Sequence, residues 1–190
     1  MTDHDWIHCG PIDWLRGRHH GEDETVLLYF KGTTPAAVAD GLIAQRRPPF
    51  ARGGDPAPGD WGVIVHPLFD HARDDYGVVD YRRLCPEDAE LAVFVPNPCI
   101  GKAHGPEAYH FRDGRFSFSV SYENTLFTEE YLPDGLVSLV TEAGLDPRGE
   151  CSGARDREQR LTALICDHLG LPALDRAAMT VDHELMADYW

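Results

Sequence analysis

The segment at residues 107–123 constrains the fold most, because a turn signal lies there between two stretches of alternating side chains. Asp113-Gly114 is typical of a two-residue hairpin turn, since both central positions of such a turn need a positive φ. The turn also determines the register of the two strands. Four pairs are then expected to lie opposite each other: Arg112 with Arg115, Phe111 with Phe116, His110 with Ser117, and Tyr109 with Phe118.

The same alternation predicts that the two faces of this hairpin differ. We expect one face to be buried against an amphipathic helix over residues 155–169: Tyr109, Phe111, Phe116, Phe118, Val120 and Tyr122. Polar side chains share the other face: His110, Arg112, Arg115, Ser117, Ser119 and Ser121. If solvent covers this face, then His110, Arg112 and Arg115 form a recognition surface for a partner or ligand. His66, which ends an earlier strand pattern, is a further candidate for that surface.

Other parts of the chain predict further strands and helices. Short apolar and β-branched runs predict strands at residues 25–30, 61–65 and 91–95. Helices are predicted from Thr34-Pro35, over 134–144, over 155–169 and from Thr180, with helical turns near the N-terminus. The chain lacks the alternation of strands and helices that would indicate a parallel sheet. The sequence therefore predicts an α+β protein with a mainly antiparallel sheet of four to six strands and helices at both ends.

The length suits one domain. A chain of 190 residues can bury roughly 70% of its unfolded surface, so one hydrophobic core is sufficient. We expect a single domain over residues 1–190, with loose attachment of residues 1–23 left open as an alternative. Residues 46–60 contain four Pro and three Gly, which predicts a loop.

Composition and charge exclude several classes of protein. A hydrophobic fraction of 43% is too high for a disordered chain. No apolar run approaches the roughly 20 residues that a membrane span needs, and no signal-peptide pattern begins the chain. Asp and Glu total 32 against 17 Lys and Arg, a net charge of −15. Such an excess repels nucleic acid and anionic lipid and attracts basic proteins.

The five cysteines are irregularly spaced and odd in number, and they contain no C-x-x-C pair. This pattern favours free thiols in a reducing cytoplasm over a disulfide framework or a zinc site. Cys99, Lys102 and His104 fall close together on a Gly- and Pro-containing loop after a strand. Lys102 would lower the pKa of the thiol and His104 would act as a base, so these residues are candidates for catalysis.

Histidines near the N-terminus raise the question of a metal site. His4 and His8 share a helix face if the segment is helical, and His19 and His20 follow. No third ligand occurs at a fixed spacing, so we predict no metal and no cofactor and leave these four histidines open.

Four stretches carry a family resemblance: residues 26–35, 61–65 and 92–97 and the hairpin turn at 112–115. Over about residues 25–145 the chain resembles a family of short actinobacterial proteins of unknown function. His66-Pro67-Leu68-Phe69 departs from the family, which tends to have an acidic residue, proline and a polar turn there. The aromatic-acid-proline that tends to follow the hairpin is also missing at Tyr122-Glu123-Asn124. The resemblance implies a fold and no activity.

Two functions remain open from the sequence. The first is an acidic cytosolic binding protein, of the immunity or regulatory type, that engages a basic protein partner. The alternative is a small tailoring or isomerase-like enzyme that acts on a small molecule, with a pocket near residues 97–105 and a lid at residues 46–60. We expect no nucleic acid and no membrane as partner.

Overall fold

A seven-stranded antiparallel sheet forms the centre of the molecule, in the order β6-β5-β4-β1-β3-β2-β7. The structure is a computed structural model that describes residues 4–17, 24–96, 106–122, 134–145 and 154–189. The strands are β1 (Thr25–Lys31), β2 (Ala51–Arg52), β3 (Gly62–Pro67), β4 (Glu90–Val95), β5 (Glu107–Arg112), β6 (Arg115–Ser121) and β7 (Thr180–Val181). The α+β class and the antiparallel sheet are confirmed. The sheet has more strands than expected because two short pairings, β2 and β7, extend one edge.

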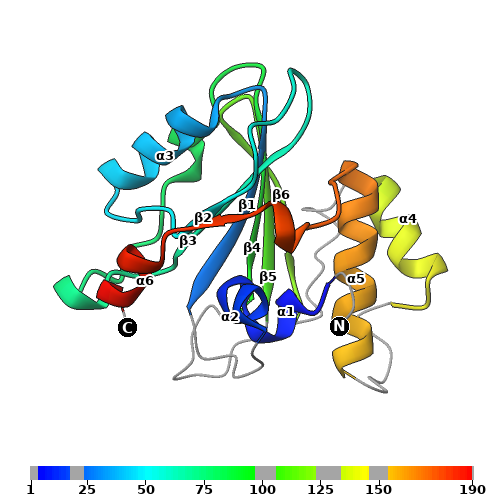
Figure 1. Cartoon of the computed structure of the whole chain (residues 1–190). Helices are drawn as coiled ribbons and strands as arrows, with labels where there is room; N and C mark the ends of the chain where they lie inside the picture. The colour runs from blue at the N-terminus through cyan, green and yellow to red at the C-terminus, as the bar shows by residue number, and fades with distance from the viewer. Residues whose placement is uncertain (1–3, 18–23, 97–105, 123–133, 146–153, 190) are drawn as a thin grey trace.

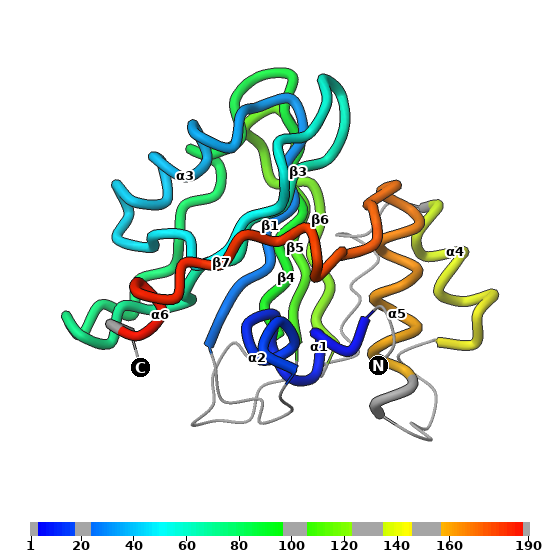
Figure 2. The backbone as a smooth tube through the Cα atoms, in the orientation of Figure 1, coloured from blue at the N-terminus to red at the C-terminus, as the bar shows by residue number. Residues whose placement is uncertain are grey.

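Helices cover both faces of the sheet, as Figures 1 and 2 show. They are α1 (Trp6–Cys9), α2 (Pro11–Arg16), α3 (Pro35–Ala44), α4 (Asp134–Glu142), α5 (Ala154–Leu169) and α6 (His183–Tyr189). Short 3-10 helices are η1 (His71–Arg73), η2 (Tyr81–Leu84) and η4 (Arg176–Ala178). Helix α3 lies on one side of the sheet and α5 lies on the other, with α4 packed outside α5 (Figure 1). We call these sides the α3 face and the α5 face.

The N-terminal segment packs into the core. Trp6, Ile7, Ile12 and Trp14 are all buried, and they belong to the same apolar cluster as α5. Pro11 opens α2 at its first turn, where its missing N–H costs no hydrogen bond. The described part of residues 1–23 is therefore not loosely attached.

Two predicted helix starts illustrate how local signals work here. Thr34 accepts a hydrogen bond from Ala37 N at 3.1 Å, so α3 begins with the predicted cap and with Pro35 at its first position. Thr180 does not begin a helix. It pairs with Arg52 in the sheet, and α6 begins three residues later, where Asp182 accepts from Leu185 N.

The β5–β6 hairpin forms around the predicted turn. Asp113 and Gly114 have φ of 53° and 70°, and the pairs Arg112–Arg115 and Phe111–Phe116 are confirmed. Beyond them the register shifts, because a β-bulge inserts Ser117 as an extra residue. His110 consequently pairs with Phe118 and Tyr109 with Ser119, so the two other predicted pairs are wrong.

The bulge redistributes the aromatic residues between the two faces of the sheet. Phe118, Val120 and Tyr122 are buried on the α5 face, as predicted. Phe111 packs instead on the α3 face, with Tyr109 partly buried against the same cluster. Phe116 contacts the Phe111 ring edge-on and keeps 40% of its surface exposed. Alternation along a strand predicts the face of each side chain only as long as every residue pairs with one partner. The extra residue in the bulge shifts the side chains that follow it on β6 to the opposite face.

Within the described residues, we find no helix with both the length and the apolar character needed to cross a bilayer.

Candidate functional site

The four residues predicted for a partner surface lie in three different places. His66 and His110 are 0% and 2% exposed, and they project from opposite faces of the sheet. Arg112 and Arg115 are exposed at the tip of the hairpin. His110 was expected to be solvated, but the bulge leaves it opposite Phe118, whose ring stacks on the imidazole with centroids 5.0 Å apart. Only the two arginines are available to a partner.

His66 belongs to a buried polar contact on the α3 face. Its Nδ1 lies 2.8 Å from the Pro67 carbonyl, and its Nε2 lies 3.2 Å from the Tyr81 hydroxyl. Because the carbonyl only accepts, Nδ1 donates to it and Nε2 accepts from Tyr81. Burial lowers the pKa of His66 to about 4. The imidazole is therefore neutral at physiological pH and acts as a fixed link between β3 and η2.

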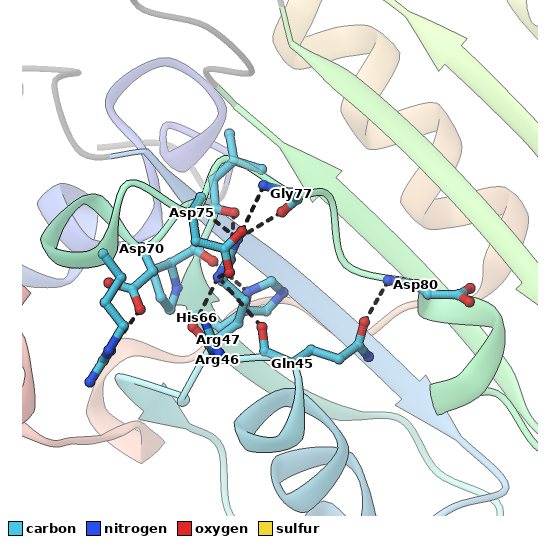
Figure 3. A network of polar contacts seen from close by, with 11 residues as sticks. Gln45, Arg46, Arg47, His66, Asp70, Asp75, Gly77 and Asp80 are labelled. Atoms are coloured by element: carbon cyan, nitrogen blue, oxygen red, sulfur yellow. Dashed lines mark hydrogen bonds and ion pairs between the residues drawn. The ribbon is translucent and has the colours of Figure 1, made fainter.

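Arg47 organises the irregular chain next to His66 (Figure 3). The side chain is 1% exposed, and its Nε donates to the Leu68 carbonyl at 2.9 Å. Nη2 donates to the carbonyls of Asp75 and Gly77 at 3.0 and 2.7 Å, while Nη1 faces the Asp75 carboxylate at 3.3 Å. The guanidinium lowers the pKa of Asp75. One buried cation thus donates to several carbonyls of a segment whose only regular structure is a short 3-10 helix and one β-bridge.

Glu90 is the centre of a charged cluster on the α5 face. It accepts from Arg112 at 2.8 Å and pairs with Lys31 at 3.2 Å. Partial burial works to raise the pKa of Glu90, but the hydrogen bonds from Arg112 and Lys31 outweigh it and lower the pKa. His110 Nε2 lies 3.4 Å from Glu90 Oε2, too far for a strong hydrogen bond. Burial lowers the pKa of His110, so Glu90 keeps its charge beside a neutral ring.

A shallow depression of about 650 Å³ lies at the end of the hairpin. We call it the hairpin-tip surface, and it is lined by Glu87, Asp88, Arg112, Asp113, Arg115, Phe116 and Ser117. Asp88 N donates to Asp113 Oδ1 at 2.9 Å, which links the loop before β4 to the hairpin turn. The surface therefore combines carboxylates held by two turns with an exposed aromatic ring.

The predicted catalytic residues Cys99, Lys102 and His104 lie at residues 97–105, outside the described residues. Of the described cysteines, Cys9, Cys85 and Cys166 are buried free thiols. Burial raises the pKa of Cys85, and raises that of Cys166 to about 12. A thiol held in its neutral form is a poor nucleophile.

The N-terminal histidines make contacts with protein groups. His8 Nδ1 lies 2.9 Å from Glu158 on α5, and the His4 ring contacts Trp6 edge-on. His19 and His20 fall outside the described residues. Among those that are described, no group of three or more His, Cys, Asp or Glu side chains could hold a metal ion.

Sequence reasoning missed the residues with the most unusual environments. Arg47 lies between Arg46 and Pro48 in a Pro-rich loop, and nothing in that pattern separates a buried arginine from an exposed one. Glu90 directly precedes the strand predicted at residues 91–95, and only the strand order brings Lys31 and Arg112 to its two sides. The exposure of Phe116 depends on the bulge, which has no signal in the sequence.

Comparisons of the chain with protein-family models, with curated proteins and with solved structures yield no significant match.

Proposed function

We propose that this chain is a non-enzymatic binding protein, of the immunity or regulatory type, that engages a basic protein through the hairpin-tip surface. The observation that carries the proposal is the exposed ring of Phe116, 40% accessible, in a depression whose rim holds the carboxylates of Glu87, Asp88 and Asp113. An apolar anchor with charged groups around it is the usual anatomy of a protein interface.

The charge of this surface supports a basic partner. Arg112 lies 2.8 Å from Glu90, which neutralises one of the two cations there. Arg115 shares the lining of the surface with three carboxylates, from Glu87, Asp88 and Asp113. The whole chain adds a net charge of −15, which attracts a basic protein from a distance and speeds its association.

The rigidity of the surface also supports binding. The hairpin turn is anchored to the loop before β4, because Asp113 N donates to the Ala89 carbonyl at 3.0 Å. Ordered carboxylates lose little conformational entropy when a partner arrives, so more of the contact energy appears as affinity.

The environments of the buried His and Cys side chains favour a binding function over a catalytic one. His66 and His110 are enclosed in the sheet with lowered pKa values, and burial raises the pKa of the Cys85 and Cys166 thiols. A cytoplasmic location belongs to the same proposal, because free thiols persist in a reducing compartment. The enzyme alternative depends on residues 97–105 and stays a prediction.

Neutralising the rim tests the proposal with little disturbance of the fold. Glu87→Gln, Asp88→Asn and Asp113→Asn remove three charges, and Asn tolerates the positive φ of 63° and 53° at positions 88 and 113. The matched control replaces three exposed carboxylates elsewhere: Asp40→Asn, Asp55→Asn and Asp60→Asn. Each protein is immobilised, and capture from host extract is compared at low and high ionic strength.

We expect the wild type and the control to retain a basic protein that salt releases, and the rim variant to lose it. Phe116→Ser should weaken capture at low ionic strength without changing how strongly capture depends on salt, because its contribution is apolar. Equal capture by the rim variant and the control, or the absence of any basic protein at low salt, would contradict the proposal.

A further inference from the structure

A second depression, of about 520 Å³, lies between α3 and α6. In Figure 1, α6 lies near α3 and beside the turn that contains η1. We call this depression the α3–α6 groove. Its lining includes apolar side chains and charges of both signs: Ile43, Pro48, Leu185, Arg46, Arg73 and Asp70. None of these residues lines the hairpin-tip surface, so the groove is a separate feature of the molecule.

Asp70 is the unusual residue of this groove. It is 0% exposed, and its Oδ2 accepts from Arg73 Nη1 at 2.7 Å. The other oxygen, Oδ1, is buried and has no hydrogen-bond partner in the described part of the chain. A buried carboxylate oxygen without a donor is costly, and in native proteins such an atom usually has a partner in water, an ion or a ligand.

The carboxylate is held on a rigid support. The backbone of Asp70 exchanges two hydrogen bonds with Asp75, at 2.9 and 3.0 Å. Arg47 fixes Asp75 in turn, through its carbonyl and its carboxylate (Figure 3). Sites that recognise small molecules are built on such preorganised groups, because little reorganisation is needed on binding.

The remaining lining of the groove complements the other parts of a small zwitterion. Ile43 is 55% exposed, which is a large apolar surface for an isolated aliphatic side chain on a helix. Arg46 is exposed on the same rim and offers a guanidinium to a carboxylate. Arg73 binds the other oxygen of Asp70, Oδ2, so it can keep that hydrogen bond while Oδ1 takes the ligand.

We propose that the α3–α6 groove binds a free α-amino acid with an aliphatic side chain. The ammonium donates to Asp70 Oδ1, the carboxylate accepts from Arg46, and the side chain packs on Ile43 and Leu185. The proposal assigns a donor to the buried oxygen of Asp70 that has none among the described residues, and it pairs each charge of the ligand with the opposite charge. It is independent of the proposed partner at the hairpin tip.

Three small molecules test which groups of the ligand the groove recognises. Titration of the full chain with L-leucine is followed by amide chemical shifts in 15N spectra and by calorimetry. Isocaproate is L-leucine without the ammonium and isoamylamine is L-leucine without the carboxylate, so both keep the branched chain. We expect saturable binding of L-leucine with shifts near residues 43, 70–73 and 185, about tenfold weaker binding of isoamylamine, and no saturation with isocaproate.

Two variants connect the binding to the groove. Asp70→Asn should weaken L-leucine binding by about tenfold or more, because the ammonium loses its charged acceptor. Asp74→Asn is the matched control: Asp74 is exposed on the same turn at φ 51°, which Asn tolerates, and binding should not change. Ile43→Ser keeps the buried carboxylate and should weaken binding several-fold, so the proposal stays testable if the Asp70 variant does not fold.

Several outcomes would overturn the proposal. One is that isocaproate binds as well as L-leucine. Another is that Asp70→Asn and Asp74→Asn behave alike. A third is that a high-resolution crystal grown with L-leucine shows only an ordered water on Oδ1. Because none of these experiments involves the hairpin tip, their failure leaves the proposed partner unaffected, and loss of partner capture leaves the groove unaffected.

Discussion

The two faces of the sheet are closed by different kinds of interaction. On the α5 face, helices contribute Leu161 and Ile165 to a cluster that holds Phe118 and Val120. A helix pairs its own backbone groups, so apolar contact is sufficient to cover the sheet. On the α3 face, part of the cover is irregular chain between β3 and β4, and its carbonyls need Arg47. A face covered in part by irregular chain therefore needs a buried donor for the carbonyls of that chain, which a helix supplies from its own backbone.

The largest expected effect is on the α5 face. Phe118→Ala should lower the free energy of unfolding by about 4 kcal/mol, because it removes a ring that is 2% exposed and leaves a cavity under α5. Chemical denaturation at neutral pH measures the loss. A loss below about 1 kcal/mol would mean that the α5 face tolerates the cavity by collapse, and the contrast between the faces would then be weaker.

Arg47→Leu tests the α3 face. The variant keeps much of the volume but leaves the buried Leu68 carbonyl and the Gly77 carbonyl without the donors that Arg47 supplies, while the Asp75 carbonyl keeps only Asp70 N. We expect a loss of about 3 kcal/mol in the free energy of unfolding. Arg52→Leu, at an exposed arginine, is the control and should change stability by less than about 0.5 kcal/mol. Similar values for both variants would show that water satisfies these carbonyls.

The pH dependence sharpens the comparison, because His66 is buried on the α3 face. Its pKa is about 4 in the folded chain and 6.5 for an unperturbed histidine. Between these values the unfolded chain binds a proton that the folded chain does not, so stability falls as pH falls. From pH 6.5 to pH 5 the loss should be roughly 1.5–2 kcal/mol. Above pH 6.5 both states are neutral at this site and the contribution is complete.

Replacing the imidazole isolates that contribution. His66→Gln should show a shallower fall in stability between pH 6.5 and pH 5 than the wild type, whatever its stability at neutral pH. Urea denaturation of both proteins across this range measures the two slopes. His110, whose pKa is also lowered by burial, keeps the remaining slope in the same direction. Equal slopes would mean that His66 takes up its proton without unfolding.

The smallest expected losses in the free energy of unfolding are at residues beside the β-bulge. Phe116→Ala should cost about 1 kcal/mol, because the ring is 40% exposed and loses mainly its contact with Phe111. Ser119→Ala, at a half-buried position on β6, should cost less than about 0.5 kcal/mol. Thermal melts of the two variants beside Phe118→Ala give the comparison. If Phe116→Ala were as costly as Phe118→Ala, then both rings would be core residues and the hairpin-tip surface would lose its anchor.

Local signals were sufficient to predict much of the fold. The strands at β1, β3 and β4 follow from short apolar runs, and α3 follows from Thr34 and Pro35. The hairpin turn at Asp113-Gly114 follows from the positive φ that its geometry requires. These features depend on residues close together in the chain, where the conformational choices are few.

The same residues did not determine which groups are exposed, buried or paired. The extra residue at Ser117 reverses the alternation along β6, and it depends on how the whole strand fits against β5. Most partners of Arg47 and Glu90 lie 21 or more positions away in the chain, and Asp70 Oδ1 has no partner among the described residues.

The sequence by itself therefore determined the class of fold, the turn and the sign of the net charge, because backbone preferences and composition are local or additive properties. Only the tertiary structure decided that His66 and His110 are buried, that Phe116 is exposed, and that Asp70 lines a groove. Burial and pairing depend on which distant segments contact each other, and strand order and packing over the whole chain determine those contacts.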